Sequence, residues 1–260
     1  MGVIPHLSSK FAKSVGAEEG PGAGPPLPLG VVRPQSAFAE SLRLLRTSLM
    51  LSSPGAPPQV VVVTSGVPGD GKTMISLNLA AILGQKQKKV LLLDGDLRRS
   101  SLSGRLGLSE KFGLSSCLAG TSNPSDIVAS IPGMPNVDFI AAGTRPPDPA
   151  DLLDSDRMRA LMATWRTQYE HIVIDTPPLL GLTDAALVSA MSDFVLLVVR
   201  ASRTSRQTLV RARDALLRAN CSKIGIVYND LSSHSADHYA YYGYYGSEYR
   251  DYYGNKSREI

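Results

Sequence analysis

The sequence is poor in the residue types that build metal centres and disulfide frameworks. Its 260 residues include two cysteines, four histidines and one tryptophan. Cys117 and Cys221 lie far apart and form no CxxC pair, which argues against a zinc site or a disulfide-stapled fold and predicts two plain structural thiols in a reducing compartment. The histidines are scattered without metal-ligand spacing. Metal chemistry held by cysteine or histidine is therefore not expected.

Long hydrophobic runs are missing as well. The two strongest, at 90–93 and 194–199, fall far short of the roughly 20 residues that a membrane span needs, and no secretory signal is evident at the N-terminus. We expect a cytoplasmic protein that is peripheral at the inner face of the cell membrane only through a partner. The net charge is a modest +4, with basic residues scattered rather than gathered with aromatics, so no nucleic-acid partner is expected.

The composition suits one α/β domain with two unusual ends. Apolar residues make up 43% of the chain and charged residues 19%, which is enough for a real core. Residues 1–33 are rich in glycine and proline without apolar periodicity, and we interpret them as a flexible leader. Residues 34–231 form the predicted domain, which begins with a helix at 35–50. Residues 232–260 form a tail crowded with tyrosine and glycine.

Within the domain, apolar strand patterns alternate with helical ones. Strands are predicted at 60–63, 88–94, 136–141, 169–175, 194–200 and 223–229. Helices are predicted at 74–83, 114–119, 124–130, 155–168, 185–191 and 205–219, and a proline-rich turn follows residue 141. This alternation predicts a mostly parallel, twisted sheet with helices on both faces. A ligand should bind at the carboxyl edge of that sheet.

The stretch from Gly66 to Thr73 matches the phosphate-binding pattern G-x-x-x-x-G-K-[ST]. It lies between a β-branched strand pattern and a helical one, which is the context of a P-loop NTPase-like fold. Backbone N–H groups and the positive helix end would then face the phosphates of a nucleotide. The nucleotide-binding residues predicted from this pattern are Gly66, Pro68, Gly69, Asp70, Gly71, Lys72, Thr73 and Met74. Lys72 would reach the β- and γ-phosphates, and the Thr73 hydroxyl would hold Mg²⁺.

Carboxylates follow two other predicted strands. Asp94 and Asp96 come directly after the apolar run at 90–93, and Asp175 ends the run at 172–174. Beside a phosphate loop, such residues are typical partners of a nucleotide-bound Mg²⁺. Taken alone, Asp94 would be a turn residue and Asp96 a helix N-cap, and Asp184 has the position of an N-cap for the helix at 185–191.

Taken together, these motifs resemble the bacterial tyrosine kinases, cytoplasmic P-loop kinases of capsular and exopolysaccharide biosynthesis. The loop Pro-Gly-Asp-Gly-Lys-Thr is similar to the Walker A form of that family, Leu-Asp94-Gly-Asp96-Leu-Arg98 to its A′ motif, and Ile-Asp175-Thr-Pro-Pro to its Walker B. Glu40, Arg43 and Arg46 match an E-x-x-R-x-x-R helix. The tyrosines that match the autophosphorylated cluster are Tyr239, Tyr241, Tyr242, Tyr244, Tyr245, Tyr249, Tyr252 and Tyr253.

The resemblance implies an ATP- and Mg²⁺-dependent protein-tyrosine kinase that phosphorylates its own tail and regulates polysaccharide synthesis or export. Its catalytic residues would be Lys72, Asp94, Asp96 and Asp175, with Thr73, Asp96 and Asp175 at the metal and Asp94 accepting the tyrosine proton. It also implies a homo-oligomeric ring closed through Glu40, Arg43 and Arg46, a membrane adaptor of the polysaccharide co-polymerase type as activator, and a cognate phosphotyrosine phosphatase.

Some of these residues also allow other interpretations. By spacing alone, Glu40 and Arg43 are an ordinary i,i+3 helix pair. Arg98 or Arg99 would neutralise transition-state charge or be a solvated structural arginine, and Asn229 is a candidate contact to adenine. The tyrosine tail alone would be a sticky, disordered segment that binds partners.

The sequence also departs from the family pattern in three places. Thr73 replaces a common serine, Ser100 a frequent proline and Asp148 a frequent asparagine, and none of these changes removes a phosphate or metal ligand. The alternative function is a nucleotide-switched ATPase scaffold of the partitioning or positioning type. Those ATPases carry an additional lysine where this chain has Val67, which favours the kinase. A nucleic-acid-bound ATPase would need a basic stripe that the sequence lacks.

Overall fold

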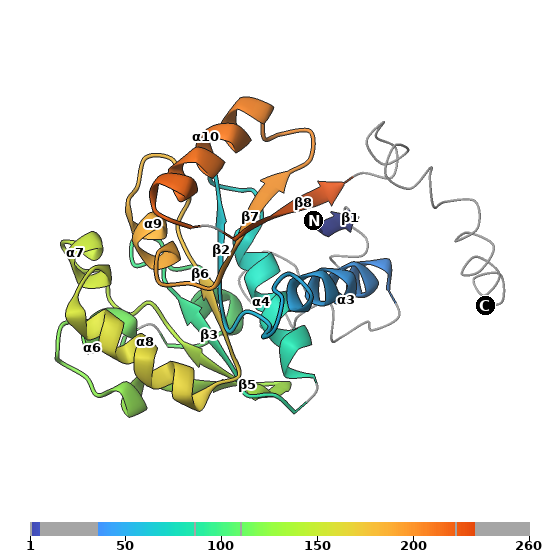
Figure 1. The fold of residues 1–260 in the computed structure, drawn as a ribbon. Coiled ribbons are helices and arrows are strands. Elements are labelled where there is room, and N and C mark those ends of the chain that lie inside the picture. Colours follow the sequence, from blue (N-terminus) through green and yellow to red (C-terminus); the bar gives the residue numbers. More distant parts are fainter. Residues whose placement is uncertain (1, 6–35, 86, 110, 222, 232–260) are drawn as a thin grey trace, which may run out of the picture.

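The computed structural model describes residues 2–5 and 36–231, apart from residues 86, 110 and 222. Its centre is an eight-stranded sheet in the order β1-β8-β7-β2-β6-β3-β5-β4 (Figure 1). All neighbouring strands are parallel except β4 and β5, which are antiparallel. The strands are β1 (Gly2–Pro5), β2 (Val60–Ser65), β3 (Val90–Asp94), β4 (Val128–Ile131), β5 (Met134–Ile140), β6 (His171–Asp175), β7 (Phe194–Arg200) and β8 (Ile224–Leu231).

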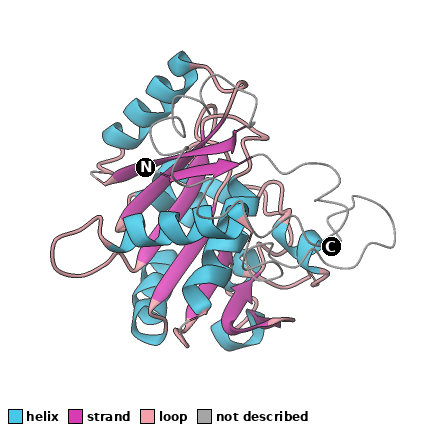
Figure 2. Cartoon of the chain, turned by 90° about the vertical axis from the view of Figure 1, so that its right-hand side faces the viewer, coloured by secondary structure: helices cyan, strands magenta, loops and turns pink. Residues whose placement is uncertain are grey.

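Helices pack on both faces of this sheet (Figure 2). They are α3 (Ala37–Met50), α4 (Lys72–Gly84), α5 (Leu102–Leu106), α6 (Leu114–Leu118), α7 (Pro149–Leu153), α8 (Asp156–Gln168), α9 (Asp184–Ser189) and α10 (Arg206–Arg218), with a 3₁₀ turn η1 at Pro124–Ile127. Side chains alternate along a strand, so each strand feeds two cores. In β2, Val61 and Val63 face the core under α3 and α4, whereas Val60 and Val62 face the core under α8 and α10.

Serine caps fix where three of the longer helices begin. The hydroxyl oxygens of Ser36, Ser155 and Ser205 accept hydrogen bonds from backbone N–H groups in the first turns of α3, α8 and α10. Such caps satisfy N–H groups that have no partner within the helix. The helices predicted at 35–50, 155–168 and 205–219 are confirmed, with ends shifted by two residues or fewer.

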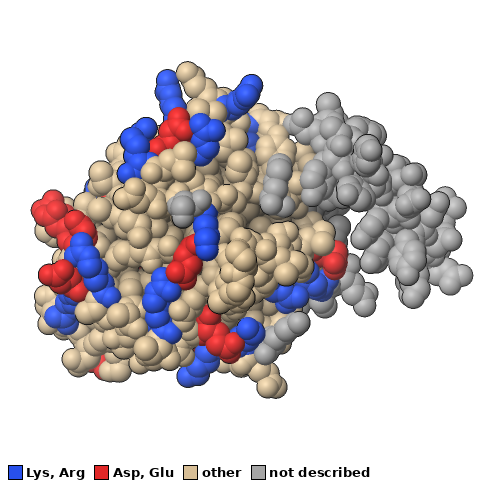
Figure 3. All heavy atoms as spheres, in the orientation of Figure 1, with Lys and Arg blue, Asp and Glu red and all other residues tan. Residues whose placement is uncertain are grey.

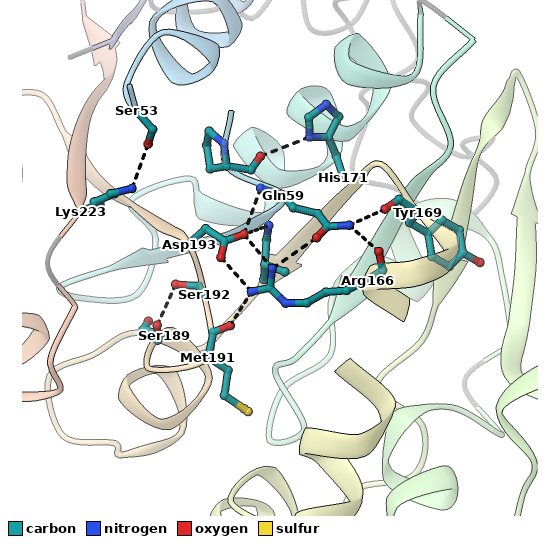
Figure 4. Close-up of polar contacts among 12 residues, drawn as sticks. Ser53, Gln59, Arg166, Tyr169, His171, Ser189, Met191, Ser192, Asp193 and Lys223 are labelled. Atoms are coloured by element: carbon teal, nitrogen blue, oxygen red, sulfur yellow. Dashed lines mark hydrogen bonds and ion pairs between the residues drawn. The ribbon is translucent and has the colours of Figure 1, made fainter. Parts of the chain in front are cut away.

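At the amino end of the sheet, one polar network holds β2, β6 and β7 in place (Figure 4). Arg166 reaches from α8 and donates to both carboxylate oxygens of Asp193, at 3.0 and 2.9 Å. Asp193 also accepts the backbone N–H groups of Gln59 and Val60, at 3.0 and 2.8 Å. The Gln59 side chain donates to the carbonyl of Tyr169 at 2.8 Å. Both oxygens of Asp193 therefore have partners, whereas the Nε2 atom of the buried His171, at the start of β6, has none among the described residues.

The prediction of a flexible leader is wrong for residues 2–5. Gly2–Pro5 form β1, which pairs with β8, more than 220 residues away along the chain, and Val3 and Ile4 are buried. In Figure 1, β1 lies between β8 and α3. The approach to α3 is close, because a Cβ on Gly2 would come within 2.8 Å of a side-chain atom of Leu45 in that helix. Four residues are too few for a periodic pattern to stand out. The remainder of the leader, at 6–33, lies outside the described residues.

Two local predictions are also wrong. The helix predicted at 124–130 is one 3₁₀ turn followed by β4, which forms an antiparallel edge hairpin with β5 around Gly133, a residue with a φ of 79°. Tertiary pairing overrides the weak helical pattern here, because the edge of β5 is free to accept a strand. The proline-rich turn contains α7, which places a proline in its first turn, where no N–H is needed.

Candidate functional site

The phosphate loop and the predicted carboxylates meet at the carboxyl edge of the sheet. β6 lies between β2 and β3, so the loop after β2 faces the ends of both acidic strands. Asp94 and Asp175 are direct partners in the β3–β6 register. The structure therefore brings together Lys72, Thr73, Asp94, Asp96 and Asp175, which come from three separate parts of the sequence.

Glycine is required in the loop for two physical reasons. Gly69 and Gly71 have φ values of 84° and 96°, in the left-handed region that side chains disfavour. At Gly71, an added Cβ would also lie 2.2 Å from the side-chain nitrogen of Asn229. Gly71 is the N-cap of α4, and Lys72 is the first residue of that helix. The free N–H groups of this helix end are suited to bind phosphate oxygens.

Side chains from β7, β8 and the loop after β7 hold the phosphate loop from behind. The Asn229 amide donates to the carbonyl of Asp70 at 2.9 Å, and the Arg200 guanidinium donates to that of Gly69 at 3.3 Å. The Thr204 hydroxyl donates to the Asp70 carboxylate at 2.7 Å. These donors occupy acceptor groups of the loop and hold its backbone in place.

Asp70 thus turns its side chain away from the phosphate side. Its carboxylate is fully buried, and one of its oxygens has no hydrogen-bond partner. Burial raises the pKa of Asp70, while the Thr204 hydrogen bond acts in the opposite direction. Asp70 shapes the loop rather than extending toward a nucleotide. Asn229 likewise supports the loop, a role that the sequence did not indicate because its partner lies 159 residues away.

The two facing carboxylates are crowded and buried. Asp94 is 0% exposed and Asp175 is 2% exposed. Burial, together with the charge of Asp175, raises the pKa of Asp94 to about 7. Burial raises the pKa of Asp175 to about 6, although the charge of Lys72 and hydrogen bonds from Thr73 and Ser76 oppose that rise. Both carboxylates would gain from a nearby cation.

Asp96 combines a structural and a candidate metal role. One of its carboxylate oxygens accepts the backbone N–H groups of Arg98 and Arg99, at 3.2 and 2.9 Å, within a turn. The N-cap interpretation of Asp96 is wrong, because the next helix, α5, has Ser101 as its N-cap. Its backbone N–H donates to Asp94 at 3.1 Å. The turn at 94–99 is thereby fixed, with Asp94 and Asp96 on it.

The donor set fits Mg²⁺ bound together with a nucleotide. Thr73 is buried, and Ser76 donates to Asp175 at 3.0 Å, so hydroxyl and carboxylate oxygens gather at one point. Hard oxygen ligands are those that Mg²⁺ prefers. Within the described residues, no three His, Cys, Asp or Glu side chains converge as a ready-made ion site. That agrees with an ion that takes most of its ligands from phosphates and water.

Arg98 is held by a buried partner that the sequence did not identify. Its guanidinium donates to both oxygens of Asp184, at 2.7 and 3.0 Å, and Asp184 is 0% exposed. Asp184 is the first residue of α9 and Thr183 is its N-cap, so the N-cap reading of Asp184 is wrong. Of the two open readings of Arg98, this ion pair supports a structural role. Arg99 is exposed.

The residues of the predicted oligomer helix lie away from this site. Arg43 pairs with Glu40 within α3, which matches the i,i+3 reading, and Arg46 donates to the carbonyl of Ile82 in α4 at 3.3 Å. The eight predicted phosphorylation sites lie outside the described residues. β8, the last described element before that segment, ends at Leu231, two residues after Asn229, which contacts the phosphate loop.

The cysteines, the surface charges and the apolar character of the helices are also visible in the structure. Cys117 and Cys221 are free and buried, and burial raises the pKa of both thiols, which confirms plain structural thiols. On the face drawn in Figure 3, basic and acidic side chains are interspersed. Among the described residues, no helix has the length and apolar character that crossing a bilayer requires.

Comparisons with known proteins agree with this geometry. A family model described as an AAA domain matches residues 59–214. The tyrosine-protein kinase YwqD of Bacillus subtilis is 32% identical over 85% of this chain and 91% of its own length. The chain belongs to the bacterial tyrosine-protein kinase family. The kinase domain of the Escherichia coli tyrosine kinase ETK superposes with a TM-score of 0.82 at 31% identity, covering 90% of this chain and 91% of that domain.

A further relative extends well beyond the matched region. The putative tyrosine-protein kinase EpsB of Ralstonia solanacearum is 38% identical over 84% of this chain, and the match spans 28% of its length. This chain thus corresponds to less than one third of that longer relative, and the matching part is the P-loop domain. The predicted P-loop NTPase-like fold is confirmed, and that fold implies a nucleotide site.

Proposed function

We propose that the protein is an ATP- and Mg²⁺-dependent protein-tyrosine kinase that phosphorylates the tyrosine cluster of its own tail. The observation that carries this proposal is the meeting of a supported phosphate loop with the buried carboxylates Asp94 and Asp175 at one sheet edge, in a chain whose relatives are named tyrosine kinases. A loop alone would support nucleotide binding. The carboxylates beside it supply the groups that phosphoryl transfer needs.

In this proposal the loop binds the nucleotide. The N–H groups from Gly69 to Thr73 and the Lys72 ammonium would hold the β- and γ-phosphates. Thr73, Asp96 and Asp175 would hold Mg²⁺ directly or through water, and the ion would neutralise phosphate charge. The charge of Lys72 already acts on Asp175, so the cation-binding and phosphate-binding groups are adjacent.

Asp94 is the proposed general base. The phenol oxygen of a tyrosine would form a bond to the γ-phosphorus, the bond from that phosphorus to the β–γ bridging oxygen would break, and ADP would leave. The phenol proton would pass to Asp94. A pKa of about 7 suits this step, because a general base is most effective when its pKa lies near the working pH.

The tail would act as both substrate and switch. β8 ends at Leu231, two residues after Asn229, which contacts the phosphate loop, and eight tyrosines in the short segment that follows would raise the local substrate concentration. Each phosphate adds about −1.5 to −2 charges. Filling all eight would take the formal net charge of the chain from +4 to about −8 to −12. Unmodified tails would dock on neighbouring copies, and modified tails would repel one another.

The proposed assembly is a ring closed through α3. Glu40 and Arg43 pair with each other and Arg46 contacts α4, so ring closure would exchange contacts within one copy for contacts between copies. A heterologous contact of this kind closes when the rotation permits. A membrane adaptor as activator, a phosphotyrosine phosphatase and a location at the inner membrane face complete the proposal, together with a role in polysaccharide synthesis or export.

Mapping phosphotyrosine tests this function. The full chain would be isolated from its own cells, where activators are present, and also incubated with ATP and Mg²⁺ after purification. Intact mass and peptide sequencing would then locate the phosphates. We expect several phosphates between Tyr239 and Tyr253, absent from Lys72→Met and Asp94→Asn. Bound ATP with a bare tail in both preparations would contradict the kinase and favour the nucleotide-switched scaffold.

A further inference from the structure

The carboxylate of Asp94 is held by two donors from the loop that follows it. The backbone N–H of Asp96 donates to one oxygen at 3.1 Å, and the Ser100 hydroxyl donates to the other at 2.9 Å. A carboxylate that accepts one hydrogen bond can still turn about its last single bond. With a donor on each oxygen, the plane of the group is fixed.

Ser100 is itself anchored on both sides along the chain. On one side, Asp96 accepts the N–H groups of Arg98 and Arg99, and Arg98 is bound to the buried Asp184. On the other side, Leu102 begins α5 and is fully buried in the core under α4. The backbone at Ser100 is therefore set by packed neighbours, so the position of its hydroxyl is defined.

We propose that Ser100 is a positioning residue that orients the Asp94 carboxylate toward the tyrosine hydroxyl of the substrate. This inference rests on the proposed kinase function and adds a residue outside the phosphate and metal ligands. Without the Ser100 hydroxyl, the Asp94 carboxylate would be held by a single donor and could rotate, and a rotated group would present its oxygens wrongly to the substrate.

Two variants and a matched control test the role of Ser100. Ser100→Ala removes the hydroxyl, and Ser100→Thr keeps it. Ser125→Ala serves as the control, because the Ser125 hydroxyl donates to the Asp126 carboxylate at 3.1 Å on an exposed turn away from the site. Unfolding midpoints would be recorded for all three full-length chains, so that a loss of activity is compared between equally folded proteins.

The first readout is turnover. We expect Ser100→Ala to lower kcat for tail phosphorylation about tenfold, since a hydrogen bond to a charged group contributes on this scale. The KM for ATP and the affinity for ADP should stay within about twofold, because no phosphate contact changes. Ser100→Thr should restore kcat. In an Asp94→Asn background, Ser100→Ala should have no further effect, because the two residues act as one unit.

The second readout needs no activity. In the nucleotide-free protein, we expect Ser100→Ala to speed amide exchange at Asp96 several-fold, since the carboxylate that accepts this N–H becomes free to rotate. Unchanged exchange at Asp96, or a kcat within twofold of the wild type, would overturn the inference. A wild-type chain that phosphorylates no tyrosine would instead contradict the proposed function, while the exchange result would still decide whether Ser100 holds Asp94.

Discussion

The two ends of the central sheet treat their carboxylates in opposite ways. At the amino end, Asp193 accepts four hydrogen bonds, two of them from Arg166. Burial alone would raise the pKa of Asp193, but Arg166 and the two backbone donors lower it below its ordinary value. At the carboxyl end, Asp94 and Asp175 face each other, and no arginine in the described part of the chain forms an ion pair with either of them. Their pKa values rise to about 7 and about 6.

This difference indicates a structural role for the polar groups at the amino end and a functional role for those at the carboxyl end. At the amino end, both oxygens of Asp193 have partners within the chain, and this network links β2, β6 and β7. The carboxyl end carries negative groups whose charge is only partly balanced, mainly by Lys72. Uncompensated carboxylates are costly to bury, and a bound cation with its nucleotide would relieve that cost. Perturbed pKa values of this kind are typical of functional sites.

The largest effect is expected from removing the charge of Asp94 at the carboxyl end of the sheet. Asp94→Asn should lower tail phosphorylation by a factor of about 100 to 10,000, the usual contribution of general-base catalysis. ADP should still bind, because the phosphate loop is unchanged. Phosphorylation rates and ADP titrations measure the two effects. Asp193→Asn is the matched change at the amino end. Equal losses of phosphorylation per folded molecule in both variants would contradict a functional role confined to the carboxyl end.

The pH dependence of stability should have opposite signs at the two ends. The native pKa of Asp94 is raised from 3.8 to about 7, so the folded state keeps a proton that the unfolded chain has lost. The free energy of unfolding should therefore fall by about 4 kcal/mol as the pH rises from 4 to 8 without nucleotide. Urea unfolding across this range measures it, and Asp94→Asn should remove most of the slope.

Asp193 provides the contrast in the same experiment. Its lowered pKa contributes stability that is present above its unfolded pKa near 4 and is lost as the pH falls further. Asp193→Asn should thus flatten the acid limb below pH 4 and leave the slope between pH 4 and 8 unchanged. A wild-type stability that rises steadily from pH 4 to 8 would show that Asp94 and Asp175 are not the dominant groups.

A smaller effect is expected from the arginine at the amino end. Arg166→Ala leaves the Asp193 carboxylate with two backbone donors, and both side chains of the pair are about one third exposed (32% and 33%). We expect a loss of about 2 kcal/mol in the free energy of unfolding. Arg159→Ala, which breaks two exposed ion pairs, should cost less than about 1 kcal/mol. Similar losses in the free energy of chemical unfolding for Arg166→Ala and Arg159→Ala would show that the Arg166–Asp193 pair contributes no more than an exposed ion pair.

The smallest predicted effect concerns the support of the phosphate loop. Asn229→Ala removes the donor to the Asp70 carbonyl, and we expect about tenfold weaker ADP binding, equivalent to about 1.4 kcal/mol. Asn136→Ala is the matched control, since the Asn136 amide donates to the Gly84 carbonyl at 2.9 Å at the far end of α4. Calorimetric ADP titrations should separate the two variants, and an unchanged affinity in Asn229→Ala would rule out this support.

The sequence predicted the elements that carry strong local patterns. The strands around 60, 90, 172 and 195, the helix after the phosphate loop and the meeting of Lys72 with the three aspartates all follow from periodicity and motif spacing. The contacts of Asn229 with Asp70 and of Arg98 with Asp184 did not follow. Each joins residues far apart along the chain, and no local pattern specifies which polar side chains will meet.

The same limit explains the two edges of the sheet. β1 has four residues and depends on β8 for its pairing, and β4 depends on the free edge of β5. Neither has enough alternating residues to be distinguished from a loop or a short helix. Their formation is decided by tertiary pairing, whereas the central strands are marked by continuous apolar runs.

Transfer of labelled phosphate between two marked chains is the decisive test of the proposed tyrosine kinase. One chain would carry Lys72→Met and an intact tail, and the other an intact site with its eight tail tyrosines replaced by phenylalanine. With γ-labelled ATP and Mg²⁺, we expect label on tyrosines of the Lys72→Met chain only, and none when Asp94→Asn is added to its partner. Label released as free phosphate, with both chains bare, would contradict a tyrosine kinase and identify an ATPase.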